Sequence, residues 1–205
     1  MTPILYSFRR CPFAMRARLA LASSGQQVAL REVVLRDKPE AFLAASPTAT
    51  VPCLVCGGAV IDESLDIMTW ALSQSDPEGW LQMPKDGWDW IARADGPFKT
   101  ALDRTKYASR YPGLDPAMQR ALAGEYLAEL NQKIDQWIFE QPSLADFAIL
   151  PFVRQFAFID KAWFDAQPWP NLQAWLESFL ISERFLTIMS KYPRWADGDE
   201  VVSFP

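Results

Sequence analysis

The chain has 205 residues, of which 50% are hydrophobic and 22% are charged, and its formal net charge is -5 with a pI near 4.8. This length and composition suffice for two small domains that each bury an apolar core. The negative net charge argues against a nucleic-acid-binding protein, which needs a basic face to engage phosphates. We also expect no membrane partner, because no stretch approaches the ~20 consecutive apolar residues of a spanning helix, and Arg9 and Arg10 interrupt the first apolar run before it could form a signal peptide.

The chain contains three cysteines and no histidine. Three cysteines in a chain of this length favour a reducing compartment, so we expect a cytoplasmic protein. The absence of histidine excludes Ser-His and Cys-His catalytic pairs as well as histidine-ligated metals, and we expect no metal site. Any catalytic thiol must therefore be activated by its helix and by neighbouring cations.

The candidate catalytic residue is Cys11, at the point where a short apolar run turns into a helical pattern. Residues 3–8 predict a strand, and residues 12–24 predict a helix. Pro12 suits the first turn of a helix, which places Cys11 at the helix N-terminus. There the unpaired N–H groups, the helix dipole and the two preceding arginines favour the thiolate over the thiol. We expect a nucleophilic or redox cysteine; the alternative is a small buried residue that ends a strand.

The helix begins with Cys11-Pro12-Phe13-Ala14 and continues with Arg16-Ala17-Arg18-Leu19. This run resembles omega-type glutathione transferases, and it is also similar to two-domain bacterial glutaredoxins. Glutaredoxins that use two thiols end the motif in a second cysteine, where this chain has Ala14, so no neighbouring thiol can resolve a mixed disulfide on Cys11. The resemblance implies that Cys11 is catalytic and that Phe13 lies in the glutathione site. Arg16 and Arg18 can assist the thiolate or pair with carboxylates across the domain boundary.

The following segments continue an alternation of strands and helices. They are a strand at 27–35, a short helix at 39–45, a hairpin of residues 51–55 and 59–61 around Gly57-Gly58, and a helix at 64–74. This order predicts an α/β sheet whose first two strands are parallel and whose last two strands form a hairpin. With the motif, it resembles the thioredoxin-like domain of glutathione transferases, which we place at residues 1–76.

The second half of the chain predicts helices. A polar segment with proline and glycine marks a linker, which we place at residues 77–86, and we expect an all-helical C-terminal domain at residues 87–205. Gly96-Pro97 is expected to bend or break the first of its helices. A long apolar face runs from Met118 to Ile138 on the second.

A helix-capping pattern opens a later helix of this domain. Ser143 and Asp146 form a Ser-x-x-Asp pattern ahead of an apolar run, in which the serine accepts an N–H bond and the aspartate reaches back. The segment resembles the one that opens a central helix in the second domain of glutathione transferases. Its expected role is stability.

Three segments carry candidate contacts to glutathione. The resemblance implies that Pro52 is cis and faces the cysteine, so that the Val51 backbone pairs with a bound peptide; an ordinary proline at a strand start is the alternative. Glu63 and Ser64, just before a helix, can hold the amine and the carboxylate of the γ-glutamyl end, or they can form a helix cap. The resemblance also places Lys38 toward glutathione, whereas a lone lysine is otherwise a solvated charge.

Cys53 and Cys56 form a Cys-x-x-Cys pattern, which is typical of redox-active disulfides and of zinc sites. Both lie in the first strand of the predicted hairpin, where side chains three apart point to opposite faces, so a disulfide between them is poorly placed. A structural zinc site lacks ligands without histidine or another cysteine pair. We expect both cysteines to be packing residues.

Together with the reactive cysteine, the resemblance implies a glutathione-dependent thiol transferase or reductase, of the omega-like or dehydroascorbate reductase type. Cys11 would form a mixed disulfide with glutathione, which a second glutathione resolves. One alternative is conventional conjugation of glutathione to electrophiles, with the hydroxyl of Tyr6 or Ser7 near the thiolate; another is a non-catalytic binding protein with the transferase fold. We expect no permanently bound cofactor, glutathione as co-substrate, and a small disulfide or electrophile as the other substrate. The resemblance implies a homodimer, which is the usual state of glutathione transferases, although the two-domain glutaredoxins are monomeric.

Overall fold

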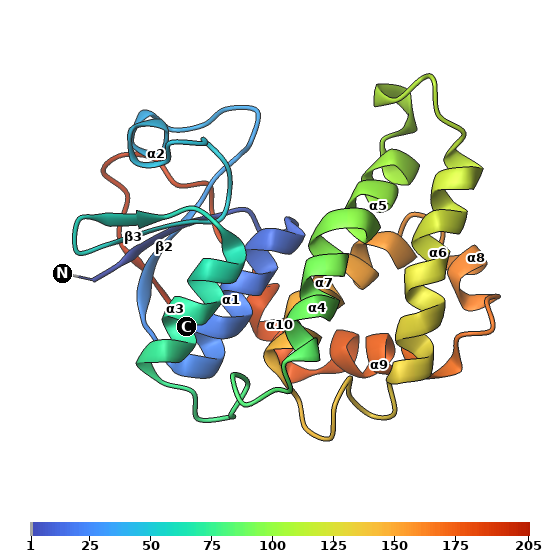
Figure 1. Ribbon diagram of the computed structural model, residues 1–205. Helices are drawn as coiled ribbons and strands as arrows, with labels where there is room; N and C mark the ends of the chain where they lie inside the picture. The colour runs from blue at the N-terminus through green and yellow to red at the C-terminus, as the bar shows by residue number, and fades with distance from the viewer. Residues whose placement is uncertain (1) are drawn as a thin grey trace. The chain divides into compact units, whose positions relative to one another are not determined.

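The computed structural model describes residues 2–205, and Figure 1 shows its helices and strands. These residues form two compact units. The first contains the chain as far as Leu81 together with Ser182–Pro205, and the second contains Gln82–Ile181. Within the described residues, the helices are too short or too polar to cross a membrane.

The first unit contains a mixed five-stranded sheet. Its strands are β1 (Ile4–Ser7), β2 (Val28–Glu32), β3 (Cys53–Cys56), β4 (Ala59–Ile61) and β5 (Val202–Phe204), in the order β4-β3-β1-β2-β5. β1 and β2 are parallel, whereas the other neighbouring pairs are antiparallel. The predicted parallel pair and the predicted β3–β4 hairpin are both confirmed.

Four helices belong to this unit: α1 (Pro12–Ser24), α2 (Glu40–Ala45), α3 (Ser64–Gln74) and α10 (Glu183–Ile188). α1 and α3 lie side by side (Figure 1). Gly25 ends α1 as predicted, with a φ of 68°, and its N–H donates to the carbonyl of Ala22. Glycine suits this position because a Cβ disfavours the left-handed region.

The C-terminal segment packs with the first unit, which differs from the expectation of a helical domain that extends to residue 205. β5 pairs antiparallel with β2 and so covers that edge of the sheet. Trp195 is buried in a cluster with Tyr6 and Phe42, and its N–H donates to the carbonyl of Glu32 at 2.9 Å. Helical periodicity could not predict this pairing, because the partner strand lies near the other end of the chain.

The second unit is helical. Its α-helices are α4 (Asp86–Arg93), α5 (Lys99–Lys106), α6 (Pro116–Lys133), α7 (Leu144–Ala157), α8 (Lys161–Asp165) and α9 (Pro170–Ile181). A π-helical turn, Ala94–Phe98, joins α4 to α5, and it contains the Gly96-Pro97 pair at which the sequence predicts a bend or break. A π turn suits a proline there, because proline has no N–H to give to the α-helical ladder.

The long apolar face predicted from Met118 to Ile138 is only partly correct. α6 ends at Lys133, and Ile134 and Ile138 are buried beyond the helix. Near the start of α6, Met118 is 59% exposed and Leu122 is 44% exposed. Apolar side chains at helical spacing therefore form the core only in the later turns of this helix.

The predicted capping box at the start of α7 is confirmed. The Asp146 carboxylate accepts the backbone N–H of Ser143 at 2.9 Å and the hydroxyl of Ser143 at 2.7 Å. It also accepts the N–H of Ile138 and the indole N–H of Trp175. Burial raises the pKa of the Asp146 carboxyl, and these hydrogen bonds act in the opposite direction.

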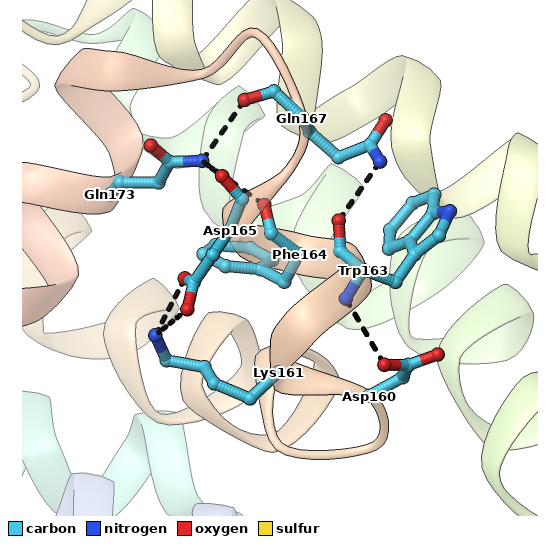
Figure 2. Close-up of polar contacts among 7 residues, drawn as sticks. All are labelled: Asp160, Lys161, Trp163, Phe164, Asp165, Gln167 and Gln173. Atoms are coloured by element: carbon cyan, nitrogen blue, oxygen red, sulfur yellow. Dashed lines mark hydrogen bonds and ion pairs between the residues drawn. The ribbon is translucent and has the colours of Figure 1, made fainter.

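Polar contacts also hold the turn around α8 (Figure 2). The Asp160 carboxylate accepts the N–H of Trp163 at the start of this helix. The side-chain amide of Gln173, on α9, lies within hydrogen-bonding distance of three carbonyl oxygens, those of Phe164, Asp165 and Gln167. The side chain of Gln173 thereby ties α9 to the end of α8 and to the turn that follows it.

Candidate active site

Cys11 is the N-cap residue of α1, directly after the loop that follows β1. Its N–H donates to the carbonyl of Phe8 and its own carbonyl accepts the N–H of Met15, both at 2.9 Å. Pro12 occupies the first helical turn, as predicted. Cys11 is thus held at the start of a helix, where the helix dipole favours the thiolate, and its side chain makes no capping hydrogen bond to the N–H groups of the first turn.

Cys11 lines a pocket of about 420 Å³ in the first unit. This volume lies within the range of small-molecule binding sites. The pocket contains every residue that the sequence analysis places at the glutathione site, namely Cys11, Phe13, Lys38, Val51, Pro52, Glu63 and Ser64. Four segments distant in sequence supply them: the start of α1, the loop after β2, the loop before β3 and the start of α3.

The backbone of Val51 faces Cys11. The peptide bond between Val51 and Pro52 is cis, as the resemblance implied. The Val51 carbonyl oxygen lies 3.6 Å from the Cys11 sulfur and accepts a hydrogen bond from the thiol. Among the described residues the structure records no hydrogen bond for the Val51 N–H. That group can therefore pair with the backbone of a bound peptide.

The start of α3 forms another wall of the pocket. Glu63 is the N-cap residue but its side chain makes no capping hydrogen bond, so the geometry does not support the helix-cap alternative for it. Ser64 is the first helical residue and is 3% exposed. The N–H groups of this turn can receive a carboxylate, and Glu63 can receive an ammonium group.

Lys38 supplies a positive charge to the same pocket. It lies in the segment between β2 and α2 and is partly buried. Within residues 2–205 the structure records no ion pair for its ammonium group. The pocket thus has one cation and two carboxylates on its walls, those of Asp62 and Glu63, which suits a ligand that carries both signs of charge.

Sequence reasoning missed part of the pocket wall. Leu35, Ala49, Thr50 and Asp62 also line it. Asp62 accepts hydrogen bonds from Ser46 and Thr48, each at 3.2 Å, and so ties the loop before β3 to the start of α3. Ala49 has a φ of 53°, which is rare for a residue other than glycine. Only the position of Asp62 next to Glu63 offered a signal in the sequence.

The hydroxyl groups considered as alternatives to Cys11 are occupied elsewhere. The Tyr6 hydroxyl accepts a hydrogen bond from Arg31 at 2.6 Å, and the Ser7 hydroxyl accepts one from Arg18 at 3.0 Å. Both residues are buried, and neither lines the pocket. The geometry therefore favours the sulfur of Cys11 as the reactive group of this site.

The other two cysteines lie in β3, outside the pocket lining. Cys53 is fully buried in the cluster that contains Tyr6 and Phe42, whereas Cys56 is partly exposed. Burial raises the pKa of the Cys53 thiol to about 12, and the neighbouring Asp62 carboxylate contributes to this rise. Cys53 is a packing residue, as predicted.

Two family models match the chain. The model described as "Glutathione S-transferase, N-terminal domain" matches residues 5–79, and the model described as "Glutathione S-transferase, C-terminal domain" matches residues 89–178. Among curated proteins, the chain is 30% identical to glutathione S-transferase L1 of Arabidopsis thaliana over 192 residues, which cover 86% of this chain and 77% of the relative. It is 26% identical to glutathione S-transferase omega-1 of Mus musculus over 191 residues, which cover 84% of this chain and 74% of the relative.

Solved structures share the fold. Glutathione transferase Omega 3C from Trametes versicolor superimposes with a TM-score of 0.78 and 18% identity, over 94% of this chain and 86% of that chain. A glutathione transferase family member from Pseudomonas fluorescens, solved with two glutathione bound, superimposes with a TM-score of 0.76 and 18% identity, over 92% of each chain.

The raised pKa of Cys53 gives a testable prediction about thiol labelling. At pH 8 only about one Cys53 thiol in 10⁴ is ionised if its pKa is about 12. Brief treatment with iodoacetamide should therefore modify Cys11 and leave Cys53 unmodified, as read by peptide mass mapping. Protein unfolded in urea is the control, in which all three cysteines should react. Labelling of Cys53 in the folded protein at the rate of Cys11 would contradict the assignment.

Proposed function

The chain belongs to the glutathione S-transferase family, and from that premise we propose that it is a glutathione-dependent thiol transferase that acts through Cys11. The observation that supports this proposal best is the position of the Cys11 sulfur. It lies at the N-terminus of α1, on the wall of the pocket, and beside the Val51 backbone. In this place the Cys11 thiolate can itself attack a disulfide, rather than only donate a hydrogen bond to the sulfur of glutathione.

In the first step the Cys11 thiolate attacks the glutathione sulfur of a glutathionylated substrate. The disulfide bond between the substrate and glutathione breaks, and a disulfide forms between Cys11 and glutathione. The substrate leaves as a thiolate and takes a proton from water. The chain has no histidine, so the helix N-terminus and nearby cations must favour the attacking thiolate.

In the second step the thiolate of a free glutathione attacks the glutathione sulfur of the mixed disulfide. Cys11 leaves as a thiolate, and glutathione disulfide is the product. A cysteine at position 14 would offer an internal route, but Ala14 occupies that position and is buried. The two steps predict ping-pong kinetics with respect to glutathione and the substrate.

The walls of the pocket suggest how glutathione is oriented. The γ-glutamyl carboxylate would accept N–H groups at the start of α3, beside Ser64, and the γ-glutamyl amine would pair with Glu63. The cysteinyl backbone would pair with Val51, and Lys38 would receive the glycine carboxylate. This orientation directs the glutathione sulfur toward Cys11, which the attack requires.

Conventional conjugation and a purely binding role are the two alternatives. Conjugation needs a hydroxyl beside the glutathione sulfur, but the hydroxyls of Tyr6 and Ser7 are buried and bonded to arginines. A binding protein has no need of a cysteine on the pocket wall. Both observations favour thiol transfer, with small disulfides or dehydroascorbate as the substrate class.

Substitution of Cys11 tests the proposed reaction. Cys11→Ser should lower the rate of glutathione-dependent reduction of a glutathionylated small thiol by at least about 100-fold, because a hydroxyl is a far poorer nucleophile at neutral pH and cannot form the disulfide. Conjugation of glutathione to an aryl halide should be unchanged or higher, since serine can donate a hydrogen bond to the glutathione thiolate. Cys56→Ser is the matched control and should retain thiol transfer. Full activity in Cys11→Ser would refute the proposal.

The orientation of glutathione gives a separate prediction. Glu63→Gln should weaken the binding of glutathione by about 1–2 kcal/mol, or roughly 5- to 30-fold in Kd, because it removes the carboxylate that pairs with the ligand amine. Calorimetric titration measures this change. Glu40→Gln, an exposed glutamate outside the pocket lining, removes the same charge and should bind as the wild type does. Equal affinities for both variants would rule out Glu63 as the partner of the amine.

A further inference from the structure

A buried arginine lies next to the proposed catalytic loop without lining the pocket. Arg18, on α1 about two turns after Cys11, is 0% exposed. Its guanidinium donates to the Ser7 hydroxyl at 3.0 Å and to the Arg9 carbonyl at 2.6 Å. A fully buried guanidinium is costly to desolvate, so a position of this kind calls for a specific role.

Glu32, at the end of β2, is the ionic partner of Arg18. One oxygen of its carboxylate lies 3.8 Å from the Arg18 guanidinium, and the other accepts the backbone N–H of Arg9 at 2.6 Å. The pair therefore holds Arg9 from both sides, by its N–H and by its carbonyl. Arg9 precedes Cys11 by two residues. Arg18 and Glu32 therefore fix the backbone of the loop that leads to Cys11. The expected pairing of Arg18 with a carboxylate across the domain boundary is wrong, because Glu32 belongs to the same unit.

The charge of Arg18 also acts on the sulfur. Burial lowers the pKa of Arg18 to about 10, which still leaves it protonated at neutral pH, and the negative charges of Glu32 and of the Cys11 thiolate act in the opposite direction. The interaction is mutual: a thiolate that stabilises the guanidinium cation is stabilised by it to the same extent. Water screens this buried charge far less than it screens the exposed charge of Arg10.

Other charged or titratable groups surround the same region. The loop and α1 supply Arg9, Arg10 and Arg16, and the pocket walls supply Lys38, Asp62 and Glu63. The C-terminal segment supplies Tyr192, which interacts electrostatically with Arg18. Arg18→Met and Glu32→Gln keep all of these residues, so the variants differ from the wild type only in the charge of the buried pair and in its hold on Arg9 and Ser7.

We propose that Arg18 and Glu32 are positioning residues that set the reactivity of Cys11. Arg18 holds the loop and favours the thiolate, whereas Glu32 holds the same loop and opposes the charge of Arg18. Both residues therefore stabilise the same loop conformation, but they shift the pKa of the Cys11 thiol in opposite directions. The inference rests on the proposed function only in taking Cys11 as the reactive thiol, and it can be tested without glutathione.

The test is the rate of Cys11 alkylation by iodoacetamide as a function of pH, measured by peptide mapping of the full chain. Arg18→Met should move the midpoint of the profile up by about one pH unit, because a positive charge near the thiolate is lost. Glu32→Gln should move it down, because the amide oxygen still accepts the Arg9 N–H while the negative charge is gone. Arg18→Lys, which keeps the charge, should retain a midpoint close to that of the wild type.

Opposite shifts distinguish this role from a structural one. A merely structural pair would give shifts in the same direction, or a slower reaction at every pH with an unchanged midpoint, and either result would overturn the proposal. Arg10→Met is the matched control, because it removes an exposed arginine next to Cys11. A shift of the midpoint in Arg10→Met as large as that in Arg18→Met would also overturn the proposal. If Arg18→Met fails to fold by circular dichroism, Glu32→Gln decides alone: an unchanged or raised midpoint overturns the proposal. Loss of thiol transfer for another reason would leave these profiles unaffected.

Discussion

The structure of the site depends on the turn that carries the chain from β1 into α1. This turn must place Cys11 at the N-cap position of α1 and its sulfur beside the Val51 carbonyl at the same time. Backbone hydrogen bonds from Cys11 to Phe8 and from Met15 to Cys11 fix the turn locally. The dipole of α1 can then favour a negative charge on the sulfur in a chain that has no histidine.

Burial separates the roles of the cysteines. Cys53 lies in the core of the first unit, and the apolar surroundings raise the pKa of its thiol to about 12. Cys11 lies at a helix start on the wall of a pocket. Burial therefore disfavours ionisation of the Cys53 thiol, whereas the start of α1 favours ionisation of the Cys11 thiol.

The sequence was sufficient for features that depend on neighbouring residues. Pro12 and Gly25 mark the two ends of α1, and the Ser143 and Asp146 pattern marks the start of α7, because capping involves residues only a few positions apart. The seven predicted site residues, although distant in sequence, do line one pocket. Their grouping was expected from the family resemblance, since residue spacing alone left Glu63 and Ser64 equally compatible with a helix cap.

The remaining features depend on contacts between distant segments. The pairing of β5 with β2 and the approach of Glu32 to Arg18 join residues that no periodicity connects. The exposure of Met118 and Leu122 has the same origin, because a helical pattern of apolar residues does not show where the covering helices end. Local pattern predicted the elements, and tertiary packing decided which of their faces and charges are buried.

The most direct test of the central claim is the reaction of the wild-type protein with glutathione disulfide, followed by intact-mass analysis and peptide mapping without reduction. The account predicts the addition of one glutathionyl group, on Cys11, and its release when reduced glutathione is added. Addition only at Cys53 or Cys56, or no addition at any concentration of the disulfide, would contradict it.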